Sequence, residues 1–70
     1  MDNTNIDNYN KLRDRFLKVY SNLPLSVREE IIYVVEEKGP INWNVAYLEI
    51  QSNTPLAKKI LNRLAELEVI

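Results

Sequence analysis

Three cationic side chains and one amide lie close together near the C-terminus, within the segment TPLAKKILNRLAE. They are Lys58, Lys59, Asn62 and Arg63. Lysine and arginine bind phosphate or guanine, and asparagine pairs with adenine, so this set has the chemistry of a DNA-reading surface. On a helix these four positions fall outside the apolar stripe and face outward. The sequence leaves open the simpler interpretation that they form only a solvated polar face.

The helix that carries these residues has a well-defined start. Thr54 is a typical N-cap residue, and Pro55 suits the first helical position because its missing N–H needs no partner there. Its apolar positions are expected to face the core; they are Leu56, Ile60, Leu61, Leu64 and Leu67. In front of it, Asn42 is expected to cap a short helix over residues 43–51, preceded by an extended Ile41.

Two more helices are predicted upstream. Apolar residues at three- and four-residue steps predict a first helix over residues 6–20. The segment IIYVV could form a strand by its propensity. However, Ser26 and Glu29 have the spacing of a capping box, and Gly39-Pro40 would end a helix over residues 27–38. We therefore expect an all-α fold, a small four-helix bundle in a single domain over residues 1–70, with residues 1–5 frayed.

The C-terminal half resembles the helix-turn-helix core of winged-helix transcription regulators. The corresponding stretches are GPIN, WNVAYLEI, SNTP and ILNRLAELEVI, and their spacing matches that family without a gap. The resemblance implies helix-turn-helix topology and a DNA-binding protein that acts in transcription regulation or chromatin. Glu68 stands where the family usually has glycine, so a left-handed turn there would cost energy. The chain ends where the wing would begin, so we expect a wingless version.

A protein-interaction module on the same scaffold is the competing interpretation. Trp43 and Tyr47 lie four residues apart, a spacing that usually indicates core. If Trp43 is half-exposed at its helix start, it could form a partner-binding patch with Ile41. The resemblance also implies a homodimer more often than a monomer.

Two further polar clusters require an interpretation. Lys11, Arg13, Arg15 and Lys18 form a basic group that spreads around more than one side of the first helix, so most of it is expected to be solvated or salt-bridged.

The N-terminal segment DNTNIDNYN is rich in oxygen ligands and approximates a calcium-binding loop. It lacks the glycine and the final glutamate that such a loop needs, so a frayed polar terminus is the better interpretation.

Composition narrows the remaining function classes. Without cysteine or histidine, the chain lacks a thiol nucleophile, the commonest general base and the commonest transition-metal ligand. No serine stands beside a plausible base, so we expect no enzyme activity, cofactor or metal site. The formal net charge is −1, so any DNA binding must depend on local charge placement rather than on a basic excess. No apolar run is long enough to span a bilayer, and the expected location is the cytoplasm.

Overall fold

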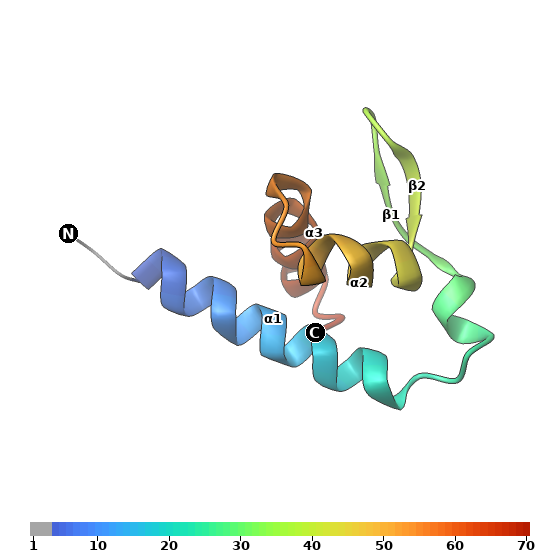
Figure 1. The fold of residues 1–70 in the computed structure, drawn as a ribbon, viewed down its shortest axis with the longest axis horizontal. Coiled ribbons are helices and arrows are strands. Elements are labelled where there is room, and N and C mark those ends of the chain that lie inside the picture. The colour runs from blue at the N-terminus through green and yellow to red at the C-terminus, as the bar shows by residue number, and fades with distance from the viewer. Residues whose placement is uncertain (1–3) are drawn as a thin grey trace.

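The structure is a computed structural model that describes residues 4–70, with side chains described from residue 8 onward. Its elements follow the order α1 (Thr4–Asn22), the short 3-10 helix η1 (Val27–Glu29), β1 (Ile31–Val35), β2 (Gly39–Asn42), α2 (Trp43–Gln51) and α3 (Pro55–Glu66). The long helix α1 lies along one side, α2 and α3 pack above it, and the β1–β2 hairpin projects from the far end (Figure 1).

The expectation of an all-α four-helix bundle is wrong. Three of the predicted helices form close to their expected bounds, but residues 27–38 do not form a helix. Ser26 itself has helical φ and ψ and makes no side-chain cap hydrogen bond, so the predicted capping box is absent. Only one 3-10 turn follows, and the chain then becomes extended. The fold is a mixed helix and strand domain.

The β-hairpin forms because the segment IIYVV pairs with a second segment instead of following the helix signals that precede it. β1 pairs antiparallel with the segment GPIN, with Tyr33 opposite Ile41 and Val35 opposite Gly39. The Lys38 N–H closes the turn on the Val35 carbonyl at 3.2 Å. Gly39 has φ +82°, the left-handed conformation that a hairpin turn needs and that glycine adopts without strain. Gly39 was expected to adopt this conformation at the end of a helix, whereas in the structure it does so at the hairpin turn.

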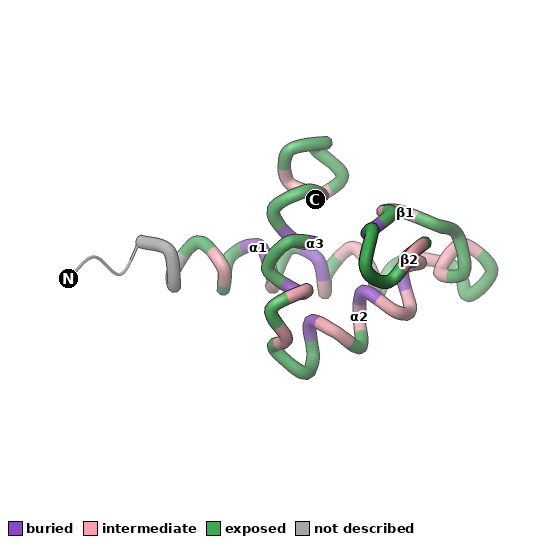
Figure 2. The backbone as a smooth tube through the Cα atoms, turned by 90° about the horizontal axis from the view of Figure 1, so that it is seen from above, coloured by how far each residue is buried: buried purple, intermediate pink, exposed green. Residues whose placement is uncertain are grey.

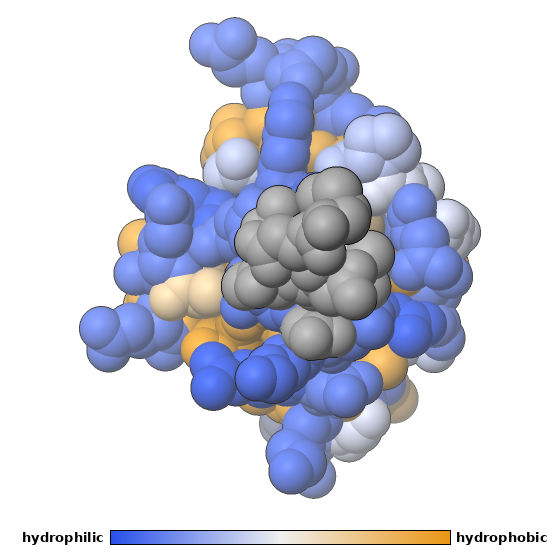
Figure 3. Space-filling model, turned by 90° about the vertical axis from the view of Figure 1, so that its left-hand side faces the viewer, coloured by the Kyte–Doolittle hydropathy of each residue, from blue (hydrophilic) through white to orange (hydrophobic). Residues whose placement is uncertain are grey.

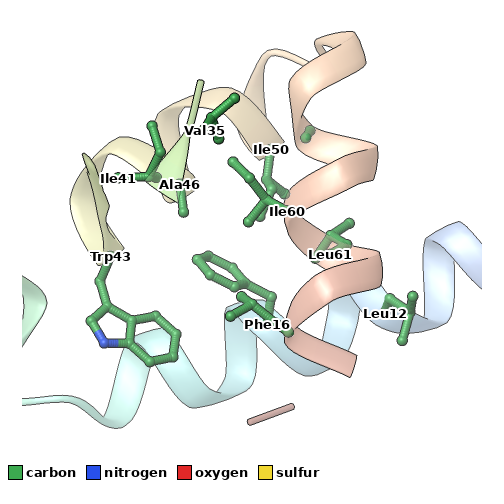
Figure 4. Packing of buried hydrophobic residues seen from close by; sticks show 11 residues of the cluster. Leu12, Phe16, Val35, Ile41, Trp43, Ala46, Ile50, Ile60 and Leu61 are labelled. Carbon is green, nitrogen blue, oxygen red and sulfur yellow. The ribbon is translucent and has the colours of Figure 1, made fainter. Parts of the chain in front are cut away.

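The core lies where α1, α2, α3 and one face of the hairpin meet. Phe16 of α1 points toward Ile60 and Leu61 of α3, while Ile50 and Ala46 approach from α2 (Figure 4). The buried segments of the three helices face one another, and the hairpin turn is exposed (Figure 2). Phe16 also packs against Trp43, with ring centroids 5.5 Å apart. The domain therefore buries its apolar side chains in one cluster shared by all the major elements.

The last helix ends in a left-handed residue, as the position of Glu68 indicated. Glu68 has φ +58°, and the Val69 N–H donates to the Leu64 carbonyl at 2.9 Å. This is the Schellman arrangement that commonly ends a helix, here with glutamate in the glycine position. Leu67, expected in the core, is 52% exposed because it lies beyond the last buried turn of α3.

Candidate nucleic-acid interface

Helices α2 and α3 are joined by a turn of three residues. Asn53 in this turn has φ +53°, and the Thr54 N–H donates back to the Glu49 carbonyl at 3.2 Å. The two helices then cross rather than run antiparallel (Figures 1 and 2). Helix-turn-helix units likewise join two crossing helices by a turn of three or four residues. Asparagine tolerates the left-handed region better than most residues, so the turn forms without glycine.

Two side-chain caps fix where these helices begin. The Asn42 Oδ1 accepts the Val45 N–H at 2.7 Å, and the Thr54 Oγ1 accepts the Ala57 N–H at 3.2 Å. Both N-caps were predicted from the sequence, and the structure confirms them. Each helix therefore begins at a residue whose side chain satisfies a backbone N–H of its first turn.

Glu49 connects three elements beside the start of α3. Its carboxylate accepts a hydrogen bond from the Thr54 hydroxyl and forms an ion pair with Lys38 of the hairpin turn at 2.9 Å. The hydrogen bond from Thr54 and then the bond from Lys38 lower the pKa of Glu49 below its ordinary value near 4.5. The carboxylate is therefore engaged inside the fold and does not face outward as a competing negative charge.

All four residues predicted to contact DNA lie on the exposed side of α3. Lys59 pairs with Glu37 of the hairpin turn at 3.6 Å, and Arg63 pairs with Glu66 on its own helix at 3.2 Å. Within residues 8–70, Lys58 takes part in no ion pair, and the Asn62 side chain makes no hydrogen bond. The structure thus brings the predicted residues together, with two of the three cations already neighbouring carboxylates.

An open cleft separates the hairpin turn from the start of α3. Its volume is about 340 Å³, and Val35, Pro55 and Leu56 supply its apolar lining. Glu37 and Glu49 line the same cleft together with their partners Lys59 and Lys38. Because each cation here has a carboxylate beside it, the cleft offers no excess charge to an ionic ligand.

The predicted partner-binding residues are in the core, so they form no contact patch. Ile41 is 1% exposed and Trp43 is 6% exposed. Ile41 lies on β2 opposite Tyr33, and Trp43 packs on Phe16, which explains why neither is available to a partner. The idea that Trp43 is half-exposed at its helix start is therefore wrong.

The basic group on α1 divides into two parts that the sequence interpretation did not separate. Arg13 is half-buried and donates to the Gln51 side chain at 3.4 Å, which ties α1 to the end of α2. Lys11, Arg15 and Lys18 are exposed, and their spacing of four and three residues places them on one face of the helix. The spacing itself was the signal that could have identified this face.

Charge is unevenly distributed along the chain. Residues 8–28 contain five basic side chains and one acidic one, whereas residues 29–49 contain five acidic side chains and one basic one. The first stretch forms most of α1 and the loop after it, and the second forms the hairpin and most of α2. The near-zero net charge therefore conceals a basic α1 and an acidic segment over residues 29–49.

The remaining expectations concern cations, membranes and the N-terminus. The oxygen-rich positions Asn3 and Asp7 lie outside the residues whose side chains are described. In the segment 1–5, which was expected to fray, only the backbone of Thr4 and Asn5 is described, and it belongs to α1. In the described part of the chain, acidic residues form no cluster of three suited to a metal. None of the helices within residues 4–70 combines the length and hydrophobicity that crossing a bilayer requires.

Comparison with known proteins adds no relative. No family model, curated protein or solved structure matches the chain.

Proposed function

We propose that the chain binds double-stranded DNA, with α3 as the helix that enters the major groove. The observation that carries the proposal is the pair Lys58 and Asn62, one turn apart on the exposed side of α3, which follows α2 after a turn of three residues. In helix-turn-helix units the recognition helix contacts base edges from its N-terminal part. Lysine suits guanine or phosphate, and asparagine suits adenine, so the pair can both anchor and read a duplex.

The two neighbouring cations support the same proposal. Lys59 and Arg63 pair with Glu37 and Glu66, but all four side chains are at least half exposed to solvent. Exposed ion pairs contribute little to stability, so a DNA phosphate can displace the carboxylate at small cost. The resemblance to winged-helix regulators stays a prediction, and it agrees with a role in transcription or chromatin.

The test is duplex binding measured by fluorescence anisotropy over a range of salt concentrations. We expect the wild-type chain to bind a labelled duplex and to lose affinity steeply as salt rises. Lys58→Gln should weaken binding to every sequence, and Asn62→Ala should reduce the preference between sequences. Leu25→Glu is the matched control, since it makes the same change in net charge at a loop residue that is 75% exposed and lies outside α3 and the Glu49 network. Absence of duplex binding at low salt would refute the proposal.

One observation favours a second candidate function, a non-catalytic protein-interaction module. The sheet has only two strands in the described chain, so the outer edge of β1 has no partner strand. Pro40, which has no N–H, lies opposite Val34, so the backbone groups of Val34 point toward that free edge. Ile31 and Val34 on the same strand are 55% and 66% exposed. An exposed apolar edge strand is a template for pairing with another chain.

Sedimentation of variants distinguishes this candidate. A homodimer formed through β1 should become monomeric in Val34→Lys, because a lysine on an edge strand opposes strand pairing. Leu48→Lys is the matched control, since Leu48 is also an exposed apolar residue, 63% exposed, but lies on α2. A wild-type chain that remains monomeric at high concentration, or a dimer equally lost in both variants, would exclude pairing through β1.

A further inference from the structure

A row of polar side chains runs along α1 on the side turned away from the core. It is called the α1 stripe here, and its members are Asn8, Lys11, Arg15, Lys18 and Asn22. At about 100° per residue, their three- and four-residue steps confine them to an arc of about 80°. All five side chains are exposed, and three of them are cations. The stripe therefore presents a row of positive charge along one face of α1.

The cations of the α1 stripe make no contact that holds the fold together. The side of α1 that carries Leu12 and Phe16 packs into the core, about 120° around the helix from the stripe. Within the described side chains, none of the three cations of the stripe takes part in an ion pair. Asp14 lies at the edge of the stripe, four residues before Lys18, and is the nearest acidic position on the helix after residue 8.

The structure points to a ligand with regularly spaced negative charges. Lys11 and Lys18 are separated by about 10 Å of helix rise, with Arg15 between them. One strand of B-DNA presents one phosphate per roughly 3.4 Å of its axis, so about three phosphates fall within the same span. Lysine and arginine contact phosphates, and the amide of Asn8 can donate to a phosphate oxygen at one end. At the other end, the Asn22 amide donates to the Lys18 carbonyl at 3.0 Å.

We propose that the α1 stripe is a second nucleic-acid surface, which contacts the phosphate backbone while α3 reads bases. The proposal rests on the proposed function for the choice of a duplex as ligand. The two proposals concern different surfaces, because α1 packs against α3 through its apolar side and the α1 stripe faces away from that contact.

An anionic membrane presents phosphates too, but the structure favours nucleic acid. A helix that binds a lipid surface needs an exposed apolar face to insert, and the apolar face of α1 is buried in the core. Around the grey residues in Figure 3, the end of the molecule where α1 begins is mostly hydrophilic, with small separate hydrophobic areas. The stripe therefore has the charge but not the apolar surface for a membrane.

The test compares single neutralising variants by their salt dependence on a labelled 20-base-pair duplex (a length of about two helical turns). The slope of log affinity against log salt is negative, and Arg15→Gln and Lys18→Gln should each reduce its magnitude by about 0.9. Between about 50 and 200 mM salt, each variant then loses roughly 3-fold less affinity than the wild type. Leu25→Glu, with the same change in net charge at an exposed loop residue, should leave the slope unaltered, and Asp14→Asn should increase affinity.

The outcomes separate this proposal from the one on α3. If Lys58→Gln reduces the magnitude of the slope while Arg15→Gln and Lys18→Gln do not, the proposal for the α1 stripe is refuted and the proposal for α3 stands. If only the two stripe variants reduce it, the proposal for the α1 stripe stands and the proposal that α3 contacts DNA is refuted. If the chain binds phosphatidylserine vesicles through Arg15 and Lys18 but binds no duplex, both nucleic-acid proposals are overturned. Far-ultraviolet circular dichroism confirms that each variant remains folded.

Discussion

The hydroxyl of Thr54 donates a hydrogen bond to the carboxylate of Glu49, so the first residue before α3 is bound to the last turn of α2. The same oxygen accepts the Ala57 N–H and caps α3. Lys38 then connects Glu49 to the hairpin. One small polar network therefore links the start of α3 to α2 and the hairpin, while the buried residues Ile60, Leu61 and Leu64 pack the helix into the core.

Removing the hydroxyl of Thr54 should destabilise the domain measurably. Thr54→Ala deletes both the cap of α3 and the bond to Glu49, and loss of an N-cap typically costs about 1 kcal/mol. Thr54→Ser keeps the hydroxyl and is the control, which should retain most of the stability. Urea denaturation followed by circular dichroism measures both. Equal stability of the alanine and threonine chains would contradict the role of this residue as a cap.

Glu49 should make stability depend on pH in the acidic range. Its pKa is lowered in the folded chain, so the carboxylate contributes its full stabilisation above the ordinary value near 4.5. This contribution is lost as the pH falls through the lowered folded pKa, because protonation then breaks the bond from Thr54 and the pair with Lys38. We expect Glu49→Gln to flatten this part of the curve of melting temperature against pH. Glu36→Gln, in the exposed hairpin turn, should leave the curve unchanged.

Glu68→Gly should stabilise the chain. Glu68 adopts φ +58°, and for a residue with a side chain this conformation costs roughly 1–2 kcal/mol. Glycine adopts it freely, so a gain of about 1 kcal/mol in the free energy of unfolding is expected after its larger unfolded-state entropy is included. Asn53→Gly is an informative comparison, because asparagine tolerates φ +53° and accepts a hydrogen bond from the Tyr9 hydroxyl at 3.1 Å. We expect a smaller gain, or a loss, at position 53.

Tyr20 should contribute through both its ring and its hydroxyl. The ring stacks on Tyr47 at 4.5 Å between centroids, and the guanidinium of Arg28 lies over it at 4.3 Å. The hydroxyl donates to Asn44 at 2.8 Å. Tyr20→Phe should cost about 1 kcal/mol for the lost hydrogen bond, and Tyr20→Leu should cost more because stacking is lost too. Thermal unfolding of the two variants checks this order, and a reversed order would contradict it.

The sequence predicted elements whose signals are local. Asn42 and Thr54 cap helices within three residues of their own position, and α1 follows from apolar residues on one stripe. Residues 27–38 were predicted wrongly because the deciding interaction is not local. Ser26 and Glu29 favour a helix when considered alone, whereas pairing with residues 39–42 makes IIYVV a strand. A five-residue run of β-branched and aromatic residues was the better signal.

The candidate sites could be predicted to different extents. The exposed positions of Lys58, Lys59, Asn62 and Arg63 follow from the apolar pattern of α3, and the structure agrees. The pair of Lys59 with Glu37 could not be predicted, because it depends on the hairpin reaching the start of α3. The α1 stripe could have been found from the sequence, since Lys11, Arg15 and Lys18 repeat at helical spacing once Arg13 is set aside.

The separation of a basic α1 from the acidic segment over residues 29–49 gives a nearly neutral chain an electric dipole. In the field of a polyanion, a dipole experiences a torque before any contact forms, and its basic end turns toward the negative charge. The same field repels the acidic segment, so encounters with a duplex are biased toward α1. This bias weakens as salt shortens the Debye length to about 10 Å at 0.1 M. The first contact with DNA would then be made by α1, and the order in which the two helices bind would depend on ionic strength.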